Sequence, residues 1–204
     1  MITPNGCASS EDADGVVLSV EKAVRGGVSF VQLRDKETQG SLKMAYAHRL
    51  RKVTANGAWL VINADPEIAR QCGADGVHFP EHMMGHITGL RGDDCLRLVG
   101  CSVHSSEKAL QAARLGAHYV QVGTMFSTQS HPGKVPEGVA LVREVRQCLD
   151  EGGFEDVAII GVGGINKGNC GTVVGEGADG VAVIQSLCDS SDPEGEARSL
   201  IEAM

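Results

Sequence analysis

Near its end the chain reads Gly177-Ala178-Asp179-Gly180-Val181, a turn of small residues that leads into an apolar run of strand length. Similar stretches precede three earlier apolar runs, at 27–31, 73–77 and 116–120. With further apolar runs between them, these repeats introduce every second predicted strand. Alternate strands of an eight-stranded parallel barrel fill the same side-chain layers, so this period favours a closed (β/α)₈ barrel, the TIM barrel.

Apolar runs alternate with helical patterns along the whole chain, which indicates an α/β protein. Eight strands are predicted, at 1–3, 28–33, 59–62, 76–79, 96–102, 119–122, 157–161 and 180–184. Helices are predicted at 42–53 and, more briefly, at 66–72, and others begin near Ser105, Val139, Asn169 and Pro193. The acidic stretches 9–14 and 189–194 are interpreted as loops. An open doubly wound sheet is the alternative architecture.

The length and composition of the chain suit one domain spanning residues 1–204. A chain of 204 residues can bury a substantial core without disulfides or metals. Aromatic residues make up only 3% of the sequence, whereas it contains 27 glycines. This composition favours buried aliphatic strands joined by tight turns over an aromatic-rich β-sandwich.

The formal net charge of −8 argues against binding to nucleic acids or anionic membranes, because both need a basic face. Seven scattered cysteines contain no Cys-x-x-Cys pair, which indicates a reducing compartment rather than a disulfide framework or zinc site. The N-terminus has no signal-peptide pattern and no stretch could span a bilayer. We therefore expect a soluble cytoplasmic protein, or one in an organelle interior if a transit peptide was removed. A homo-oligomer is compatible with the sequence.

In a barrel, functional residues lie in the loops that follow the strands. The turn at Gly163 and Gly164 follows a late apolar strand and precedes a helix, so its backbone amides could surround a phosphate. The end of the next strand brings Ile184 and Gln185 into the same predicted phosphate site. The alternative is a purely structural glycine turn.

A second candidate follows the strand predicted at 28–33. Alternation along the extended chain places Gln32, Arg34 and Lys36 on one side, where two cations suit an anionic substrate. The alternative is a solvated turn in which these cations pair with Asp35 or Glu37.

A third candidate lies at the end of the strand predicted at 96–102. Ser102 is a candidate substrate-binding residue, and His104 is expected to face the barrel mouth and to exchange a proton near neutral pH. Ser105 is predicted to cap the next helix. The alternative is a histidine that merely forms hydrogen bonds at a strand end.

Two further stretches complete the candidate substrate site. After the strand predicted at 59–62, Asn63 could face a ligand while Asp65 caps the next helix. The polar loop at 124–134 could hold an anion or close as a lid, through the side chains of Thr128, Ser130 and His131. It could equally be a surface loop. We predict no metal site at His78, His82 and His86, because no ligand signature surrounds them.

Several of these motifs together resemble the thiamine phosphate synthase and TenI superfamily of aldolase-type barrels, over nearly the whole chain. The resemblance is carried by Gln32-Leu33-Arg34-Asp35-Lys36, Ala74-Asp75-Gly76-Val77-His78, Ser102-Val103-His104-Ser105, the loop at 126–133, Gly163-Gly164-Ile165 and the stretch at 177–184.

The resemblance implies two activities. The synthase joins hydroxymethylpyrimidine pyrophosphate to a thiazole phosphate with magnesium, and the TenI branch isomerises a thiazole phosphate carboxylate tautomer. The synthase's two metal-binding aspartates correspond here to Ala64 and Met83, although Asp65 or Glu81 could substitute. The synthase's lysine in the lid loop corresponds to His131.

These departures favour a TenI-like tautomerase with His104 as its catalytic residue and no cofactor. Retention of Gln32, Arg34 and Lys36, which resemble pyrophosphate-binding residues, points instead to a thiamine phosphate synthase, which would need Mg²⁺. A non-catalytic protein that binds a phosphorylated ligand is a third alternative.

Overall fold

A computed structural model describes every residue except 8, 56, 91, 129–132 and 134. The described residues form two compact units. The first comprises Met1–Val77, Asp94–Arg97 and Ile184–Glu202, and the second comprises His78–Asp93, Leu98–Val183 and Ala203–Met204. In the described part of the chain, no helix combines the length and apolar character needed to cross a membrane.

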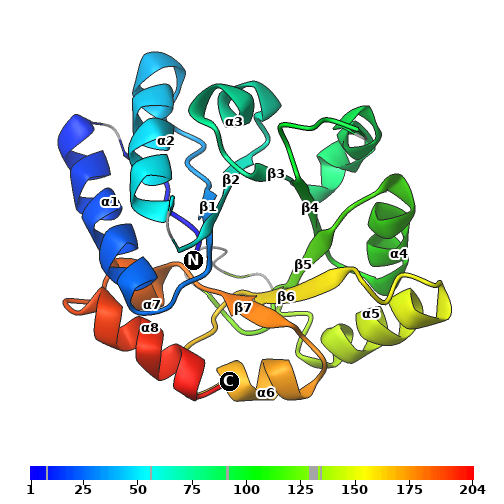
Figure 1. Cartoon of the computed structure of the whole chain (residues 1–204). Helices are drawn as coiled ribbons and strands as arrows, with labels where there is room; N and C mark the ends of the chain where they lie inside the picture. The colour runs from blue at the N-terminus through cyan, green and yellow to red at the C-terminus, as the bar shows by residue number, and fades with distance from the viewer. Residues whose placement is uncertain (8, 56, 91, 129–132, 134) are drawn as a thin grey trace. The chain divides into compact units, whose positions relative to one another are not determined.

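Strands and helices alternate along the chain, as the sequence predicts (Figure 1). The strands are β1 (Phe30–Leu33), β2 (Trp59–Asn63), β3 (Gly76–Phe79), β4 (Leu98–Val103), β5 (Tyr119–Gly123), β6 (Ala158–Val162) and β7 (Gly180–Ala182). The helices are α1 (Ser10–Arg25), α2 (Gly40–Thr54), α3 (Pro66–Cys72), the 3₁₀ helix η1 (Glu81–Leu90), α4 (Ser106–Leu115), α5 (Ala140–Glu151), α6 (Cys170–Gly175), α7 (Gln185–Cys188) and α8 (Pro193–Glu202).

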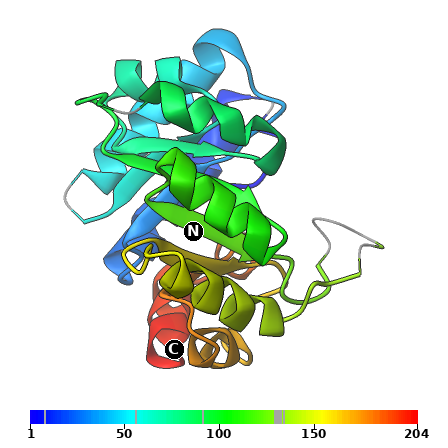
Figure 2. The same ribbon diagram turned by 90° about the vertical axis from the view of Figure 1, so that its right-hand side faces the viewer.

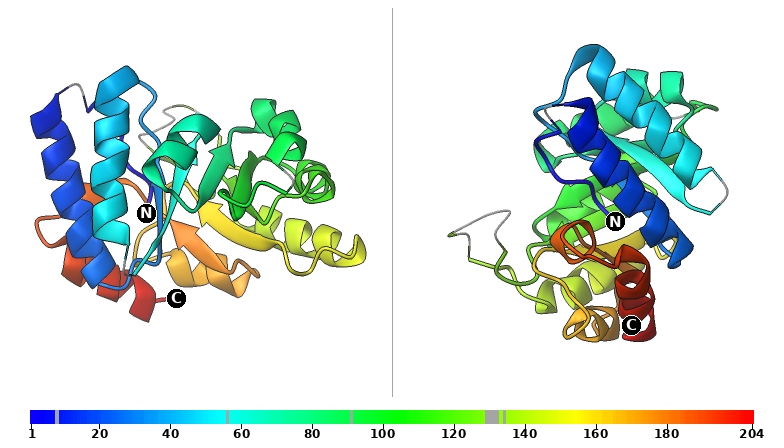
Figure 3. Two further views of the ribbon diagram at one scale, coloured as in Figure 1. Left: turned by 45° about the horizontal axis from the view of Figure 1, so that its top comes forward. Right: turned by 90° about the vertical axis from the view of Figure 1, so that its left-hand side faces the viewer.

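In the first unit, β1 and β2 pair in parallel, with Phe30 opposite Trp59 and Leu33 opposite Ile62. Helix α1 packs beside α2 and α8, and α2 also contacts β2 (Figure 3). The central residues of both strands are buried, including Val31 and Val61 at 0% exposure. Apolar burial between the strands and these helices therefore forms the core of this unit.

In the second unit, β4, β5, β6 and β7 pair in parallel in chain order. Helices α4 and α5 lie side by side along this set of strands (Figure 2). The buried aliphatic residues of these strands include Val99, Val103, Val120, Val122 and Ile159, which is typical of a parallel sheet covered by helices. The parallel α/β class predicted from the sequence is confirmed.

The strand predicted at residues 1–3 is only partly formed. Ile2 makes an isolated parallel bridge to Gln32, with hydrogen bonds of 2.9 Å on either side of it. Seven strands and this bridge are present among the described residues. Closure into an eight-stranded barrel and the single-domain organisation stay predictions.

The interpretation of residues 9–14 as a loop is wrong, because α1 begins at Ser10. The Ser9 hydroxyl accepts a hydrogen bond from the Asp12 amide, and the Asp12 carboxylate accepts one from the Ser9 amide. This capping box starts a helix, and acidic side chains in the first turn also interact favourably with the helix dipole.

Three of the sequence repeats form the same pair of reciprocal hydrogen bonds with a neighbouring strand. The residue pairs are Asp75 with Leu60, His118 with Val99, and Asp179 with Ile159. In each pair the backbone N–H of the repeat residue donates to the strand carbonyl at 2.8 Å. The strand N–H in turn donates to the repeat side chain, at 2.7 to 3.0 Å. The repeats thus satisfy backbone groups at the start of the strands.

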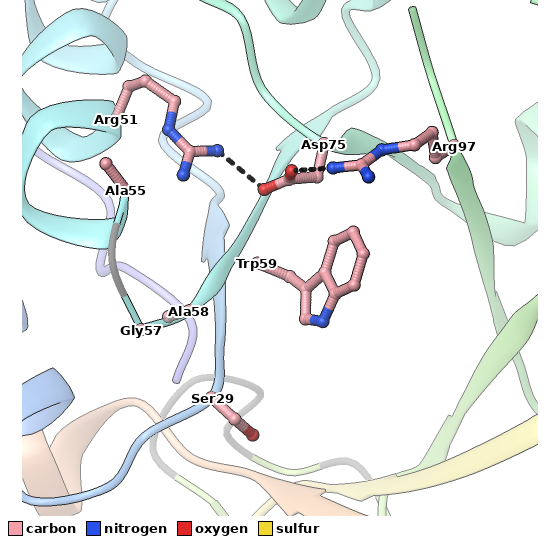
Figure 4. A pocket seen from close by; sticks show the side chains of 8 residues that line it. All are labelled: Ser29, Arg51, Ala55, Gly57, Ala58, Trp59, Asp75 and Arg97. Carbon is pink, nitrogen blue, oxygen red and sulfur yellow. Dashed lines mark hydrogen bonds and ion pairs between the residues drawn. The ribbon is translucent and has the colours of Figure 1, made fainter. Parts of the chain in front are cut away.

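Asp75 also binds two arginines beside a shallow pocket of about 260 Å³ (Figure 4). Its carboxylate lies 2.7 Å from Arg51 and 2.9 Å from Arg97, and the Arg97 guanidinium lies 4.9 Å from the centre of the Trp59 ring. The pocket is lined by Ser29, Arg51, Ala55, Gly57, Ala58, Trp59, Asp75 and Arg97. These residues precede or begin strands, whereas the predicted functional residues follow strands.

Candidate functional site

In the first unit, Asp35 organises the loop that follows β1. Its side chain is 2% exposed, although it is a carboxylate. It accepts hydrogen bonds from the backbone amides of Gly6 (3.3 Å), Cys7 (3.0 Å), Glu37 (2.9 Å) and Thr38 (3.2 Å), and from the Thr38 hydroxyl (2.5 Å). Asp35 therefore ties the β1 loop to the chain near Gly6.

The hydrogen bonds of Asp35 bear on the two interpretations of Arg34 and Lys36, and substrate binding by these two residues stays a prediction. Both oxygens of Asp35 bind amides and a hydroxyl, and among the described residues no ion pair joins Arg34 or Lys36 to Asp35 or Glu37. Arg34 is half-buried, and burial lowers the pKa of its guanidinium with no contribution from a carboxylate. Lys36 is exposed, and its amide donates to Asn5 at 3.2 Å. The loop therefore carries two cations that form no ion pair with Asp35.

Gln32 and Asn63 meet at the carboxyl ends of β1 and β2. Gln32 is 1% exposed, and its Nε2 donates to Asn63 Oδ1 at 3.2 Å. Ala64 follows in a left-handed conformation with φ of 60°, which alanine adopts less readily than aspartate or asparagine. Asp65 caps α3, as predicted, by accepting from the Ile68 amide at 3.0 Å.

We expect Asp35 to make stability acid-sensitive. Burial alone would raise the pKa of Asp35, but hydrogen bonds from Thr38, Glu37 and Cys7 outweigh it and lower the pKa to about 2, from 3.8. Because the folded-state pKa is depressed, the stabilisation is complete above about pH 4 and is lost as the pH falls towards 2. The expected contribution is about 2 kcal/mol in the free energy of unfolding.

The measurement is urea unfolding of the native protein and Asp35→Asn between pH 2 and 7. The difference between their free energies of unfolding should shrink as the pH falls through this range. The exposed Asp156→Asn serves as a control. A difference that does not change with pH would contradict the role assigned to Asp35.

In the second unit, His104 follows β4 and is held at its backbone and at its ring. Its amide donates to Glu81 Oε2 at 3.0 Å, and its Nδ1 forms a short hydrogen bond with the Gly123 carbonyl. A carbonyl oxygen only accepts, so Nδ1 carries the proton and Nε2 of neutral His104 is a proton acceptor. The His104 side chain is 48% exposed.

Glu137 is a neighbour of His104 that the sequence did not indicate. Its Oε1 lies 3.8 Å from His104 Nδ1, and its Oε2 accepts a hydrogen bond from the Thr124 amide. The Glu137 amide donates to the Thr124 carbonyl at 2.9 Å. Glu137 therefore joins the two ends of the segment from 124 to 137. No motif or spacing pointed to it, because it meets His104 only in the folded chain.

Ser102 lies within hydrogen-bond distance of a buried histidine. His78 Nε2 lies 2.8 Å from Ser102 Oγ, and His78 Nδ1 lies 3.1 Å from the Tyr119 hydroxyl. His78 is 1% and Tyr119 is 3% exposed, whereas Ser102 is half-buried. The predicted cap at Ser105 is confirmed by a hydrogen bond from the Lys108 amide.

The turn at Gly163 and Gly164 packs against the segment that follows β5. Both glycines are left-handed, with φ of 100° and 65°. A Cβ at Gly163 would lie 2.5 Å from Thr124 Cγ2, and one at Gly164 would lie 2.5 Å from the Ser127 carbonyl oxygen. Phe126 N donates to the Gly163 carbonyl at 3.0 Å. Glycine is therefore required here by packing alone, and phosphate binding at this turn stays a prediction.

The remaining predicted site residues are distributed as follows. Ile184 and Gln185 belong to the first unit, where Ile184 precedes the short helix α7. Thr128 is half-buried in the second unit. Ser130 and His131 lie outside the described residues.

The described residues do not form a metal site. No group of three or more His, Cys, Asp or Glu side chains among them could hold an ion. Asp65 and Glu81, the proposed substitutes for the synthase ligands, are hydrogen-bonded to the amides of Ile68 and His104.

The comparisons with known proteins agree with the resemblance seen in the sequence. Residues 2–187 match the family described as thiamine monophosphate synthase. The chain belongs to this family. It is 37% identical to a thiamine-phosphate synthase of Roseiflexus castenholzii over 190 residues, which cover 90% of this chain and 78% of that protein. It is 32% identical to one of Shouchella clausii, with 93% and 88% covered.

Among solved structures, the thiamine phosphate pyrophosphorylase from Pyrococcus furiosus has a similar fold. The TM-score is 0.79 at 24% identity, and the match covers 99% of this chain and 92% of that one. The family is that of a thiamine-pathway enzyme. The sequence motifs favour the tautomerase. The relatives instead favour the synthase.

Proposed function

We propose that this protein is a thiamine phosphate synthase, which joins hydroxymethylpyrimidine pyrophosphate to a thiazole phosphate and releases pyrophosphate. The observation that carries the proposal is the loop after β1, where Asp35 binds amides and a hydroxyl and, among the described residues, Arg34 and Lys36 form no ion pair. Burying a cation without a partner costs free energy, so the half-buried Arg34 favours an anionic ligand. The names of the relatives support the same activity.

The proposed reaction breaks one bond and forms another at the methylene carbon of the pyrimidine. The bond to the pyrophosphate oxygen breaks with its electron pair, and the thiazole nitrogen supplies the pair for the new carbon–nitrogen bond. Negative charge therefore grows on the departing pyrophosphate. Arg34 and Lys36 would stabilise it, because guanidinium and ammonium groups bind phosphate oxygens through charge-assisted hydrogen bonds.

Other residues are proposed to position the two substrates. In the first unit, Gln32 and Asn63 would bind polar groups of the pyrimidine substrate beside the cations. Ser102, in the second unit, stays a predicted substrate-binding residue. Binding of the thiazole phosphate stays a prediction for the amides of Gly163 and Gly164 in the second unit and for those of Ile184 and Gln185 in the first. The loop at 124–134 would contribute Thr128, Ser130 and His131 to substrate binding, as the sequence predicts.

The residues at the two expected metal-binding positions do not fit the magnesium site of the synthase. Ala64 and Met83 have no oxygen donor in their side chains. We therefore assign no step to a protein-held metal. In this proposal, Arg34 and Lys36 stabilise the negative charge of the pyrophosphate.

The test is incubation of the purified protein with both phosphorylated precursors, with and without magnesium, followed by chromatography of thiamine phosphate and assay of pyrophosphate. Equal amounts of both products are expected. Absence of product under every condition, with a thiazole tautomer turned over instead, would overturn the proposal.

Tautomerase activity is the second candidate, because His104 offers an unprotonated Nε2 in its neutral form. The two activities predict different effects of His104→Asn. Condensation at the methylene carbon transfers no proton to the enzyme, so we expect synthase turnover to fall by less than about 10-fold. A proton shuttle would lose about 10² to 10⁴ in tautomerase turnover.

Both rates should be measured on the native protein and His104→Asn, with circular dichroism to confirm folding. The exposed His82→Asn is a matched control. A synthase rate reduced more than 100-fold in folded His104→Asn would assign His104 a role that the condensation does not explain.

A further inference from the structure

The buried residues His78 and Tyr119 form a hydrogen-bonded chain that ends at Ser102. We propose that Tyr119 and His78 are positioning residues that fix the Ser102 hydroxyl as a hydrogen-bond donor to a lone-pair acceptor of the substrate, a ring nitrogen or an oxygen. This inference rests on the proposed function, because it assumes that Ser102 contacts a substrate.

The three side chains run from the core of the second unit towards its surface. Tyr119 is 3% and His78 is 1% exposed, and Ser102 at the end of the chain is half-buried. Residues two apart in a strand point to the same face, so the Ser102 side chain shares the face of His104 just beyond the end of β4. The outer end of the chain is therefore at the candidate site.

The chemistry of the groups sets the direction of both hydrogen bonds. A phenol is a strong donor and a weak acceptor, whereas the bare nitrogen of a neutral imidazole is a strong acceptor. Burial raises the pKa of Tyr119, so its hydroxyl keeps its proton. The favoured arrangement has Tyr119 donating to Nδ1 over 3.1 Å, which places the imidazole proton on Nε2.

The tautomer of His78 decides whether the Ser102 hydroxyl donates or accepts a hydrogen bond. Nε2–H of His78 donates to Ser102 Oγ over 2.8 Å, so the serine oxygen already accepts a hydrogen bond from inside the protein. Its own proton is then directed to another acceptor. The opposite tautomer would have Ser102 donate to His78 and would leave it to accept from the substrate.

Tight packing holds the two rings in place. A Cβ at Gly100 would lie 2.0 Å from Tyr119 Cζ, so the Tyr119 ring fills the space beside the backbone of β4. The His78 and Tyr119 rings also stack, with centroids 5.6 Å apart. Close packing therefore keeps the ring nitrogens of His78 near the two hydroxyl groups.

The first test is direct and needs no substrate. Long-range ¹H–¹⁵N spectra of labelled protein distinguish protonated from bare ring nitrogens, and comparison with His78→Gln assigns the signals of His78 among the seven histidines. We expect a proton on Nε2 and a bare Nδ1. A proton on Nδ1 alone would overturn the proposal, whether or not the protein makes thiamine phosphate.

The second test is a double-mutant cycle with the synthase assay. Tyr119→Phe keeps the ring and removes the hydroxyl, and we expect kcat/KM to fall about 10-fold, the effect of one weakened hydrogen bond. In Ser102→Ala, the further change Tyr119→Phe should alter kcat/KM less than 2-fold.

The matched control is Tyr46→Phe, because Tyr46 is equally buried but lies in α2 of the first unit. It should change kcat/KM less than 2-fold. Tyr119→Phe could instead lower kcat/KM by the same factor in the native protein and in Ser102→Ala. That result would show that Tyr119 acts only by stabilising the core, and it would overturn the proposal. If the native protein makes no product while His78 carries its proton on Nε2, the proposed function fails and the orientation of Ser102 stands.

Discussion

Gly164→Ala should reduce the free energy of unfolding by about 3 kcal/mol or more. The left-handed backbone at Gly164, with φ of 65°, strains any side chain. The added Cβ would also lie 2.5 Å from the Ser127 carbonyl oxygen and 2.8 Å from Phe126 Cβ. The second cost is large because backbone atoms cannot move aside as a flexible side chain can.

Gly153→Ala provides the matched control for this experiment. Gly153 has a φ of 77°, and a Cβ there would have no neighbour within 4 Å. Gly153→Ala should therefore reduce the free energy of unfolding only by the conformational cost of a left-handed alanine, about 1 to 2 kcal/mol. Urea unfolding of the two variants and the native protein measures both values. Equal losses would show that the segment after β5 does not press on Gly164.

This packing limits what substitution of Gly164 can say about a ligand. A residue such as aspartate would repel an anion, but its Cβ would already disturb the turn. Reduced phosphate affinity in such a variant would not separate the two effects. Titration of the native protein with inorganic phosphate and thiazole phosphate is the better probe of the amides.

Arg34→Met should lower kcat/KM for the pyrimidine pyrophosphate about 10² to 10³-fold. The physical reason is that the variant removes a charge-assisted partner for the leaving group in a partly buried site, where such bonds are strong. Methionine keeps much of the apolar stem, and the Arg34 amide can still donate to Thr3 Oγ1, at 2.9 Å in the native protein. We therefore expect the loop after β1 to remain in place.

The measurements are steady-state kinetics with the pyrimidine substrate varied, and calorimetry with inorganic pyrophosphate. Lys52→Met removes an exposed charge from α2 and should change kcat/KM less than 2-fold. Arg34→Lys should recover only part of the loss, since an ammonium cannot bind two oxygens in the planar geometry of a guanidinium. Unchanged pyrophosphate affinity in folded Arg34→Met would remove Arg34 from the proposed site.

The sequence alone determined the features that depend on neighbouring residues. Asp65 and Ser105 start their helices through side-chain bonds to amides three residues on, and β3, β5 and β7 follow the predicted repeats. The helix starting at Ser10 was missed although its capping box, Ser9 with Asp12, was present in the sequence.

Only the tertiary structure decided which groups meet across long separations. The charge of Asp35 could have neutralised Arg34, but Gly6 and Cys7, almost thirty residues earlier, supply amides to it. Glu137 meets His104, and His78 meets Tyr119, through the pairing and packing of separate elements. A hydrogen bond or ion pair forms with whichever partner the fold brings within about 3 to 4 Å, and local sequence does not specify that partner.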